Sequence, residues 1–350
     1  MKQLFFLSLA FLAITACRKV EVDGEKEIII VNQPVNNTTT AGNTITLSGR
    51  ITKDTTLYAK DFNYLSGIVY VTKGVTLTVE AGAKVMGKFS GADVSALVIC
   101  RGAKIIAKGT VDKPIVFTSS SANPQSGDWG GIILCGTAPI NTSFTVNGAS
   151  IQGLYQVEGG IDNANGDGLA GAGDAAFPTV NPADNSGILQ YVRIEYAGYA
   201  YQPDKEVNSL TMAAVGSGTT IDHVQASFGK DDSFEWFGGT VNCKYLISYK
   251  GQDDDFDTDN GYSGYVQFGI AVRDSAIADI SKSEAFESDN NATGTTATPK
   301  TSAVFSNMTV IGPRATLDNK GNTLFLAGAQ IRRNSGISIQ NSVFIGWPIA

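Results

Sequence analysis

The chain has 350 residues, of which 43% are hydrophobic and 17% are charged. It is long enough for one large domain or two ordinary ones, and too apolar to be a disordered chain. Its formal net charge of −7 excludes nucleic acid as a partner, because a polyanion requires a basic surface. The 39 glycines and the many β-branched residues are poor helix formers, so the composition favours an all-β fold.

The N-terminus carries the features of a secretory signal. Lys2 precedes an apolar run at 4–14 that is too short to span a membrane as a helix. The ending ITAC at 14–17 resembles the bacterial lipobox, in which the cysteine is acylated; an ordinary signal peptide with an incidental cysteine is the alternative. We predict a lipoprotein signal peptide over residues 1–16 and a lipid anchor on Cys17 that attaches the protein to a membrane.

Residues 17–45 are predicted to form a flexible tether behind the lipidated cysteine. The stretch VNQPVNNTTTAGN at 31–43 is polar and lacks apolar periodicity. The acidic residues in RKVEVDGEKE at 18–27 resemble the surface-export signal of Bacteroidota lipoproteins. We therefore expect the protein to be anchored in the outer membrane and to face the cell surface.

Three cysteines remain once Cys17 is set aside. Cys100, Cys135 and Cys243 each lie in or beside an apolar run of strand length, so we expect small buried hydrophobic side chains. The sequence contains no CxxC and no His/Cys cluster, which argues against a zinc site.

From about residue 46 the chain repeats itself. GAKV at 82–85 returns as GAKI at 102–105, a shift of 20 residues, and runs such as IDHVQASFG at 221–229 end in glycine. Alternating apolar residues bounded by glycine predict strands, and intervals of about 20 to 34 residues are too short for strand–helix–strand units. We predict a single-stranded right-handed parallel β-helix over residues 46–350, a solenoid whose coils bury one another.

The single histidine belongs to this repeat. His223 aligns with Tyr191, Tyr245, Asn307 and Asn341 at one position of successive coils. Side chains at such a position stack into ladders along a solenoid. We therefore expect a structural role for His223 and not a catalytic one.

Two segments depart from the repeat. Residues 137–187 form an insertion rich in Gly, Asn, Asp and Ala, and loops of this length are usually functional or disordered; a lid, a cap and an adhesive loop all remain open. The final FIGWPIA is apolar and lacks a polar capping coil. Because the end of a β-helix exposes strand edges, we expect a truncated C-terminal end or a covering element.

Two acidic blocks, DDSFE at 231–235 and DDDFD at 253–257, lie 22 residues apart. If Ser227 stacks on Ser248, the blocks occupy adjacent rungs about 4.8 Å apart, and FESDN at 286–290 follows on the next rung. Like charges so close raise one another's pKa, and Ca²⁺, with about 6 to 8 oxygen ligands, is the simplest compensator. Ion pairing with Lys230 and Lys250, or plain solvation, is the alternative. The predicted calcium ligands are Asp231, Asp232, Glu235, Asp253, Asp254, Asp255, Asp257, Asp259, Glu287 and Asp289, with Glu284 as a further candidate.

The insertion contains a second candidate calcium loop. NANGDG at 163–168, followed by Asp174, approximates D-x-[DN]-x-[DN]-G with an acid at position 12. Position 1 is Asn and position 12 is Asp, so a flexible polar turn is the alternative. The ligands would be Asn163, Asn165, Asp167 and Asp174.

Aromatic residues gather around the acidic blocks. Exposed rings stack on sugar faces, whereas a β-helix also stacks aromatic rings in its interior, so both interpretations stand. The candidate ligand-binding residues are Tyr199, Tyr201, Trp236 and Tyr262.

The acidic region carries a family resemblance. The stretch from DDSFEWFGG at 231 to GYVQF at 268, together with DWGGIILCG at 128–136 and FESDN at 286–290, resembles a group of secreted or cell-surface Bacteroidota lipoproteins with a pectate-lyase-like β-helix. The similarity covers roughly residues 60–350, and members continue past a motif like the GWP at 346–348. The resemblance implies the fold and the location, and it implies no activity.

These observations predict a surface-anchored lipoprotein that binds Ca²⁺ and a ligand or partner such as a polysaccharide or an outer-membrane protein. The alternative is a calcium-dependent polysaccharide lyase or glycoside hydrolase acting on the 231–289 face. QDD at 252–254 resembles one acidic motif of the polygalacturonases, which use paired carboxylates. Their Gly-His-Gly motif is absent, and nothing in the sequence around Arg193 or Arg273 marks a catalytic base.

Overall fold

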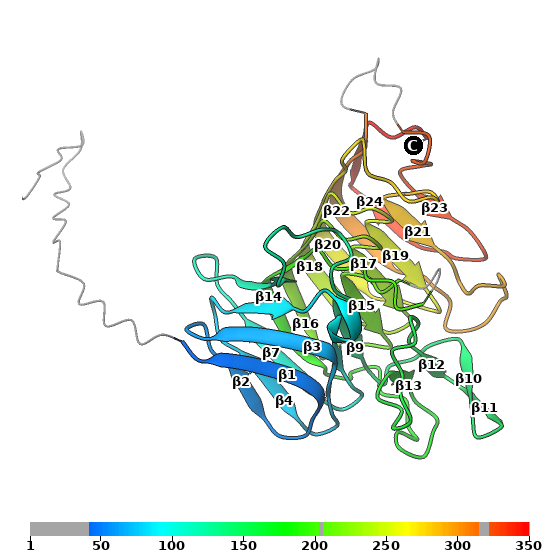
Figure 1. Ribbon diagram of the computed structural model, residues 1–350. Helices are drawn as coiled ribbons and strands as arrows, with labels where there is room; N and C mark the ends of the chain where they lie inside the picture. Colours follow the sequence, from blue (N-terminus) through cyan, green and yellow to red (C-terminus); the bar gives the residue numbers. More distant parts are fainter. Residues whose placement is uncertain (1–41, 203–205, 315–321, 350) are drawn as a thin grey trace, which may run out of the picture. The chain divides into compact units, whose positions relative to one another are not determined.

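The computed structural model describes residues 42–202, 206–314 and 322–349, which contain 25 strands and one 3₁₀ helix, η1 (Gly91–Asp93). Of these strands, 21 join in one network of parallel pairings that winds from β1 to β25 (Figure 1). The predicted parallel β-helix is therefore confirmed. The predicted signal peptide of residues 1–16, the predicted lipid anchor Cys17 and most of the predicted tether lie outside the described residues. No helix in the described part of the chain is both long and apolar enough to cross a membrane.

Each coil has three sides, which stack into three parallel sheets. Two sides meet at a corner, and the third consists of short strands. The pre-corner sheet contains β2 (Thr55–Leu57), β4 (Thr76–Val79), β7 (Lys104–Lys108), the first halves of β14 (Gly187–Glu195), β16 (Thr220–Ser227), β18 (Asn242–Tyr249), β20 (Tyr265–Val272) and β22 (Val304–Ile311), and β24 (Ser338–Gln340).

The second and third sides complete the coil. The post-corner sheet contains the first halves of β1 (Thr44–Ile51) and β3 (Phe62–Val71), then β5 (Lys84–Gly87), β8 (Ile115–Ser119), the second halves of β14, β16, β18, β20 and β22, and β25 (Val343–Ile345). The short-strand sheet contains the second halves of β1 and β3, then β6 (Ala96–Ile99), β9 (Ile132–Cys135), β15 (Leu210–Ala213), β17 (Phe234–Phe237), β19 (Phe256–Asp259), β21 (Phe286–Ser288) and β23 (Gln330–Ile331).

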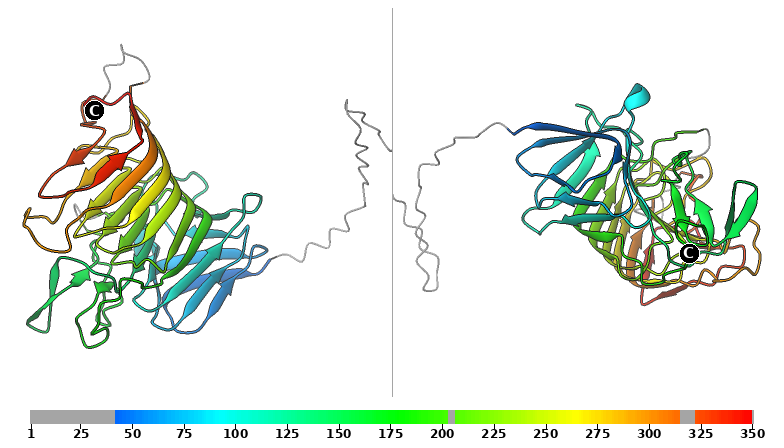
Figure 2. Two further views of the ribbon diagram at one scale, coloured as in Figure 1. Left: turned by 180° about the vertical axis from the view of Figure 1, so that it is seen from behind. Right: turned by 90° about the horizontal axis from the view of Figure 1, so that it is seen from below.

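The corner of the later coils is made by one residue in the left-handed conformation. The predicted ladder of Tyr191, His223, Tyr245, Asn307 and Asn341 is confirmed, with φ angles between 46° and 57°. Phe268 (φ 65°) also occupies this position, and the sequence alignment missed it. The rings of Tyr191, His223 and Tyr245 stack with centroids 4.3 Å apart, and Phe268 follows at 4.9 Å. This turn lets one long strand serve two sheets (Figure 2).

Inward-facing rings fill the interior beneath the short strands. Phe234, Phe256 and Phe286 lie in one register row, with successive ring centroids 5.8 and 5.2 Å apart. Trp236, on the next inward position, stacks on Tyr262 at 5.2 Å. Strand alternation thus places aromatic residues inside and leaves the intervening carboxylates outside. All three cysteines are buried and free, as predicted.

Two details of the predicted repeat were wrong. The 20-residue shift relates β5, a post-corner strand of one coil, to β7, a pre-corner strand of the next coil, because β5 pairs with β8 whereas β7 pairs with β4. Paired residues of these successive coils, such as Thr76 and Lys104, are more than 20 residues apart. The turns at Gly82 and Gly102 resemble each other only in their local geometry, since both glycines have a positive φ. The expected stacking of Ser227 on Ser248 is off by one residue: Ser227 pairs with Tyr249, and Ala226 pairs with Ser248.

The insertion at 137–187 is an ordered structure built on two hairpins. β10 (Ser143–Val146) pairs with β11 (Ala149–Gln152), and β12 (Leu154–Gln156) pairs with β13 (Leu169–Gly171). The Asn141 side chain donates hydrogen bonds to the backbone oxygens of Asn290 (2.8 Å) and Pro299 (2.9 Å). These contacts fasten the insertion to coils that follow much later in the chain.

We expect the corner to discriminate between substitutions at Tyr245. Both Tyr245→Asn and Tyr245→Val remove the ring stack, but only the β-branched valine is forced into an unfavourable conformation at φ 56°. Tyr245→Val should lose about 1–2 kcal/mol more in free energy of unfolding than Tyr245→Asn. Urea denaturation followed by circular dichroism measures the difference, and equal stabilities would contradict this account of the corner.

An acidic cleft on the short-strand sheet

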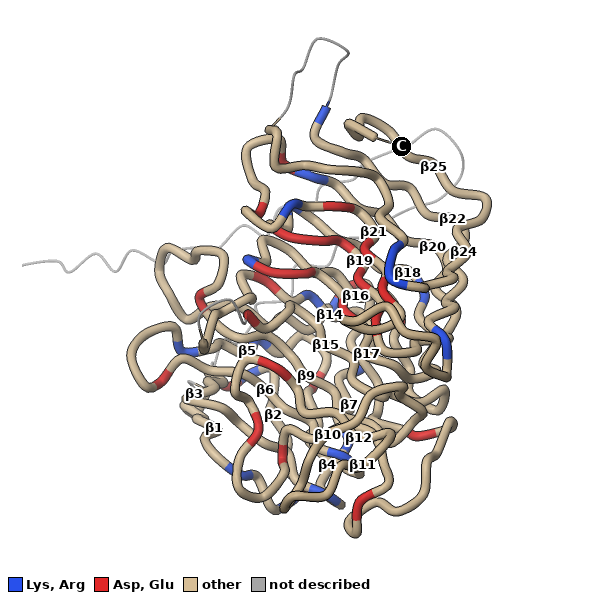
Figure 3. The backbone as a smooth tube through the Cα atoms, turned by 90° about the vertical axis from the view of Figure 1, so that its right-hand side faces the viewer, with Lys and Arg blue, Asp and Glu red and all other residues tan. Residues whose placement is uncertain are grey.

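The outward positions of the short strands form a polar row in register. Glu235 of β17 pairs with Asp257 of β19, which pairs with Glu287 of β21, and Thr211 and Gln330 extend the row at its two ends. Each residue lies between two inward-facing neighbours, so alternation turns its side chain outward. The predicted stacking of the acidic blocks is therefore confirmed for these positions, and Figure 3 shows acidic residues gathered along β19 and β21.

A second row of carboxylates lies in the turn that precedes each short strand. The Asp254 backbone N–H donates to Asp232 Oδ1 at 2.8 Å, and the Glu284 N–H donates to Asp254 Oδ1 at 2.5 Å. Each aspartate therefore uses one oxygen to join its coil to the next. The other oxygen is left for the solvent side or for a ligand.

Both rows lie in a cleft of about 820 Å³. One side carries Glu158, from the insertion, and Glu206; another carries residues 279–282, from the long turn before β21. The sequence analysis missed these wall residues, because only the folding of distant segments brings them to the cleft. The described acidic residues that line it are Glu158, Glu206, Asp231, Asp232, Glu235, Asp253, Asp254, Asp257, Asp279 and Glu287.

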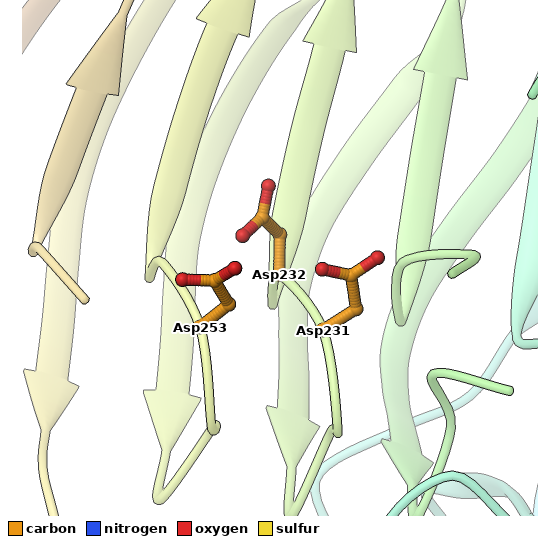
Figure 4. Close-up of side chains that lie close together, drawn as sticks. All are labelled: Asp231, Asp232 and Asp253. Carbon is orange, nitrogen blue, oxygen red and sulfur yellow. The ribbon is translucent and has the colours of Figure 1, made fainter. Parts of the chain in front are cut away.

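Three groups of carboxylates have the spacing of a cation site, with one oxygen from each member within 4.8 Å of the others. The groups are Asp231, Asp232 and Asp253; Asp232, Glu235 and Asp257; and Asp254, Glu284 and Glu287. Figure 4 shows the first group, in which Asp232 lies between the carboxylates of Asp231 and Asp253. Two buried oxygens, Asp257 Oδ1 and Glu284 Oε2, have no hydrogen-bond partner.

Positive side chains balance few of these carboxylates. Lys230 pairs with Glu206 at 3.7 Å and Lys250 with Asp274 at 3.1 Å, so the alternative, ion pairing of the two lysines with the acidic blocks, is not what the structure shows. Arg332 pairs with Glu287 and Asp289 at one end of the cleft. Within the described residues, no ion pair reaches Asp231, Asp232, Glu235, Asp253, Asp254, Asp257 or Glu284.

The uncompensated charge raises the pKa of the cleft carboxyls. Burial, and then the charge of neighbouring carboxylates, raises the pKa values of Asp231, Asp232 and Glu235 well above the ordinary range. The pKa values of Asp254 and Asp257 are raised for the same reasons, although Arg332 partly opposes the shift at Asp257. Without a cation, the cleft is therefore a site that retains protons.

Three predicted ligands have other partners. Asp255 faces inward, where it accepts from Ser248 Oγ at 2.5 Å and pairs with the fully buried Arg273 at 3.1 Å, so its assignment as a ligand was wrong. Asp289 pairs with Arg332 and Arg333. Asp259 accepts a hydrogen bond from the Asn260 backbone N–H at 2.6 Å and belongs to none of the three groups.

The acidic residues of the second candidate calcium loop form ion pairs with arginines. Asp167 pairs with Arg50 and Asp174 with Arg101. Asn163 donates to Asp167 at 2.9 Å, and its own Oδ1 accepts from the Asn165 N–H at 2.8 Å. These ion pairs fasten the insertion to the coils and do not favour a cation there.

The predicted ligand-binding aromatics divide into two pairs. Trp236 and Tyr262 are 0% exposed, so their assignment was wrong: the rings pack in the interior and no ligand can reach them. Tyr199 and Tyr201 contact each other edge to face at 4.9 Å, and neither is among the described residues that line the acidic cleft. Their role in ligand binding stays a prediction.

A second hollow, of about 500 Å³, follows the corner ladder. It is mostly apolar and is lined by Tyr191, His223, Tyr245 and Phe268 together with aliphatic residues such as Ile270. Because the ladder rings stack on one another, their faces are already covered. A sugar would therefore meet ring edges here, and the acidic cleft is the better candidate for a functional site.

The comparison with known proteins fits this fold. The model of the pectate-lyase like beta helix domain matches residues 49–350. The chain belongs to this family. No curated protein and no solved structure matches the chain. Membership of the pectate-lyase-like β-helix family suggests a carbohydrate-related role.

The stability of this pectate-lyase-like domain should fall with rising pH when no divalent cation is present. Burial, followed by the charge of Asp279, raises the pKa of Asp253 to about 7, and burial raises that of Asp259 to about 7. Unfolded aspartates titrate near about 3.9, so the folded protein binds more protons in between. The stabilisation is complete below the unfolded pKa and is lost as the pH rises through about 7. Thermal unfolding with chelator should give a lower Tm at about pH 8 than at about pH 5.5; a higher Tm at the alkaline pH would contradict the burial of these charges.

Proposed function

We propose that the protein binds Ca²⁺ in the acidic cleft and that the bound cation holds a carbohydrate ligand. The observation that carries this proposal is the convergence of three carboxylate groups, each with ligand oxygens within 4.8 Å, at a cleft whose described lining has ten carboxylates and only three cationic side chains. Buried charges that lack partners are costly. A bound divalent cation would remove this cost, because carboxylates of neighbouring coils that otherwise repel one another would coordinate the same ion.

The donor atoms favour calcium over other metals. The three groups contain only carboxylates, which are hard oxygen ligands, and the chain's single histidine lies in the corner ladder. Ca²⁺ accepts several carboxylates in flexible geometry, whereas Mg²⁺ requires a near-ideal octahedron and retains water. Zn²⁺, Cu²⁺ and Ni²⁺ prefer sites with nitrogen or sulfur ligands.

The carbohydrate part of the proposal rests on the family and on the size of the cleft. A volume of about 820 Å³ falls in the range of small-ligand sites, about 300–1,000 Å³. Lys230, Lys282 and Arg332 lie among the lining residues, and a bound cation adds positive charge. An acidic sugar would therefore be attracted only after the cation is bound, because the bare rows repel it.

The proposed setting is the cell surface. The N-terminal sequence supports a lipoprotein signal of residues 1–16 followed by an anchor on Cys17. A lipid anchor would attach the β-helix to the outer membrane and present the cleft to polysaccharides outside the cell. An outer-membrane protein as partner is the other occupant to test.

A lyase reaction that uses Arg193 or Arg273 as its base finds less support in the geometry. Arg273 is fully buried against Asp255. Arg193 lines the corner groove and pairs with Glu195 at 3.3 Å. Neither arginine lines the acidic cleft, so neither can act there as the base of a lyase.

Calcium should stabilise the protein through the cleft. A ligand that binds only the folded state adds about 2.7 kcal/mol at 100 times its Kd, so excess Ca²⁺ should raise the Tm relative to chelator. The double variant Asp253→Asn/Asp254→Asn should lose this shift, whereas Asp112→Asn, an exposed residue between β7 and β8, should retain it. An equal calcium shift in the double variant would remove the cleft from the proposal.

Ligand binding should depend on both the cation and the charge of the sugar. In affinity electrophoresis, a gel containing an acidic polysaccharide should retard the protein with Ca²⁺ and release it with chelator, and a neutral polysaccharide should not retard it. The double variant should migrate as the chelated protein does. Retardation that is unchanged by chelator would show that the cation does not hold the carbohydrate.

A further inference from the structure

The three carboxylate groups resolve into two places along the β-helix axis. The groups Asp231, Asp232, Asp253 and Asp232, Glu235, Asp257 share Asp232, and both combine residues of the β17 and β19 coils. The third group, Asp254, Glu284 and Glu287, shares no residue with them and combines the β19 and β21 coils. Because the parallel pairing repeats from coil to coil, Asp254 and Glu287 of the second place are the counterparts, one rung of about 4.8 Å further on, of Asp232 and Asp257 in the first.

We propose that the cleft holds two divalent cations, one between the β17 and β19 coils and a second between the β19 and β21 coils. This proposal rests on the proposed calcium-binding function. Asp232 is the central ligand of the first site. Asp254, Glu284 and Glu287 are the ligands of the second.

Glu284 provides the observation that points to a ligand at the second site. Its side chain is buried, with 1% exposed. Oε1 accepts a hydrogen bond from Gln330 Nε2 at 2.6 Å, whereas Oε2 has no partner. A buried carboxylate oxygen without a partner is costly, and Glu284 lies within ligand distance of Asp254 and Glu287. A cation at this point satisfies the free oxygen.

The backbone prepares each site in the same way. Asp232 Oδ1 accepts a hydrogen bond from the N–H of Asp254, and Asp254 Oδ1 accepts one from the N–H of Glu284. Both aspartates are thereby fixed with the second oxygen available, one coil apart. The repeat that stacks the coils therefore also repeats the cation site.

Charge also argues for more than one cation. Seven carboxylates of the three groups lack an ion-pair partner among the described residues, and one divalent cation compensates only two charges. A first cation between β17 and β19 leaves Glu284 uncompensated on the far coil, where Glu287 already pairs with Arg332. Since the cations repel each other across one rung, the second should bind more weakly than the first.

The test is a stoichiometry measured with Ca²⁺ alone on the whole protein. Equilibrium dialysis should give two ions per chain at saturation, with two distinguishable affinities. Glu284→Gln should remove the weaker ion and leave the tighter one, and Asp232→Asn should weaken the tighter one at least tenfold. Asp112→Asn should bind as the unchanged protein does.

Each departure from this pattern overturns a defined part of the proposal. One ion per chain, unaffected by Glu284→Gln, would overturn the second site and leave the calcium function intact. No bound ion would overturn both. If Glu284→Gln does not fold, Glu287→Gln, which is only half-buried, serves as the second variant, and retention of two ions there would overturn the second site.

Discussion

The parallel register between successive coils is the constraint on which the other features of the protein depend. Backbone hydrogen bonds hold each residue beside its counterpart one rung away, so any chemical character that recurs at one position becomes a continuous row. Phe234, Phe256 and Phe286 become an interior stack by this rule. Glu235, Asp257 and Glu287, one residue further along, become an acidic row on the outside.

The sequence was informative wherever the repeat itself carried the information. The ladder through His223 and the pairing of Glu235 with Asp257 follow from counting residues between similar motifs, because the backbone converts equal spacing into stacking. The direction in which a side chain points was harder to predict from the sequence. Asp255 and Asp257 lie two residues apart and look alike in the sequence, yet Asp255 turns inward to Arg273, because the turn before β19 interrupts the strict alternation of the strand.

The walls of the cleft could not be read from the sequence. Glu158 belongs to a segment without repeat, and nothing near it indicates which coil it will face. The sequence also could not show whether Trp236 and Tyr262 are buried or exposed, and their assignment as ligand-binding residues was wrong. Aromatic residues beside carboxylates are typical both of a sugar site and of a β-helix core, and only the packing decides between them. In this molecule the carboxylates line the cleft, while the buried rings stabilise the coils behind them.

The docking of the insertion has a consequence for how the molecule unfolds. A solenoid held only by contacts between neighbouring coils tends to open from its ends, one coil after another. Here Asn141 is hydrogen-bonded to residues 149 and 158 positions further along the chain, so the insertion bridges several coils. The coils from β9 to β21 cannot separate singly without first releasing this bridge. The insertion thus couples a modular stack into one cooperative unit around the acidic cleft.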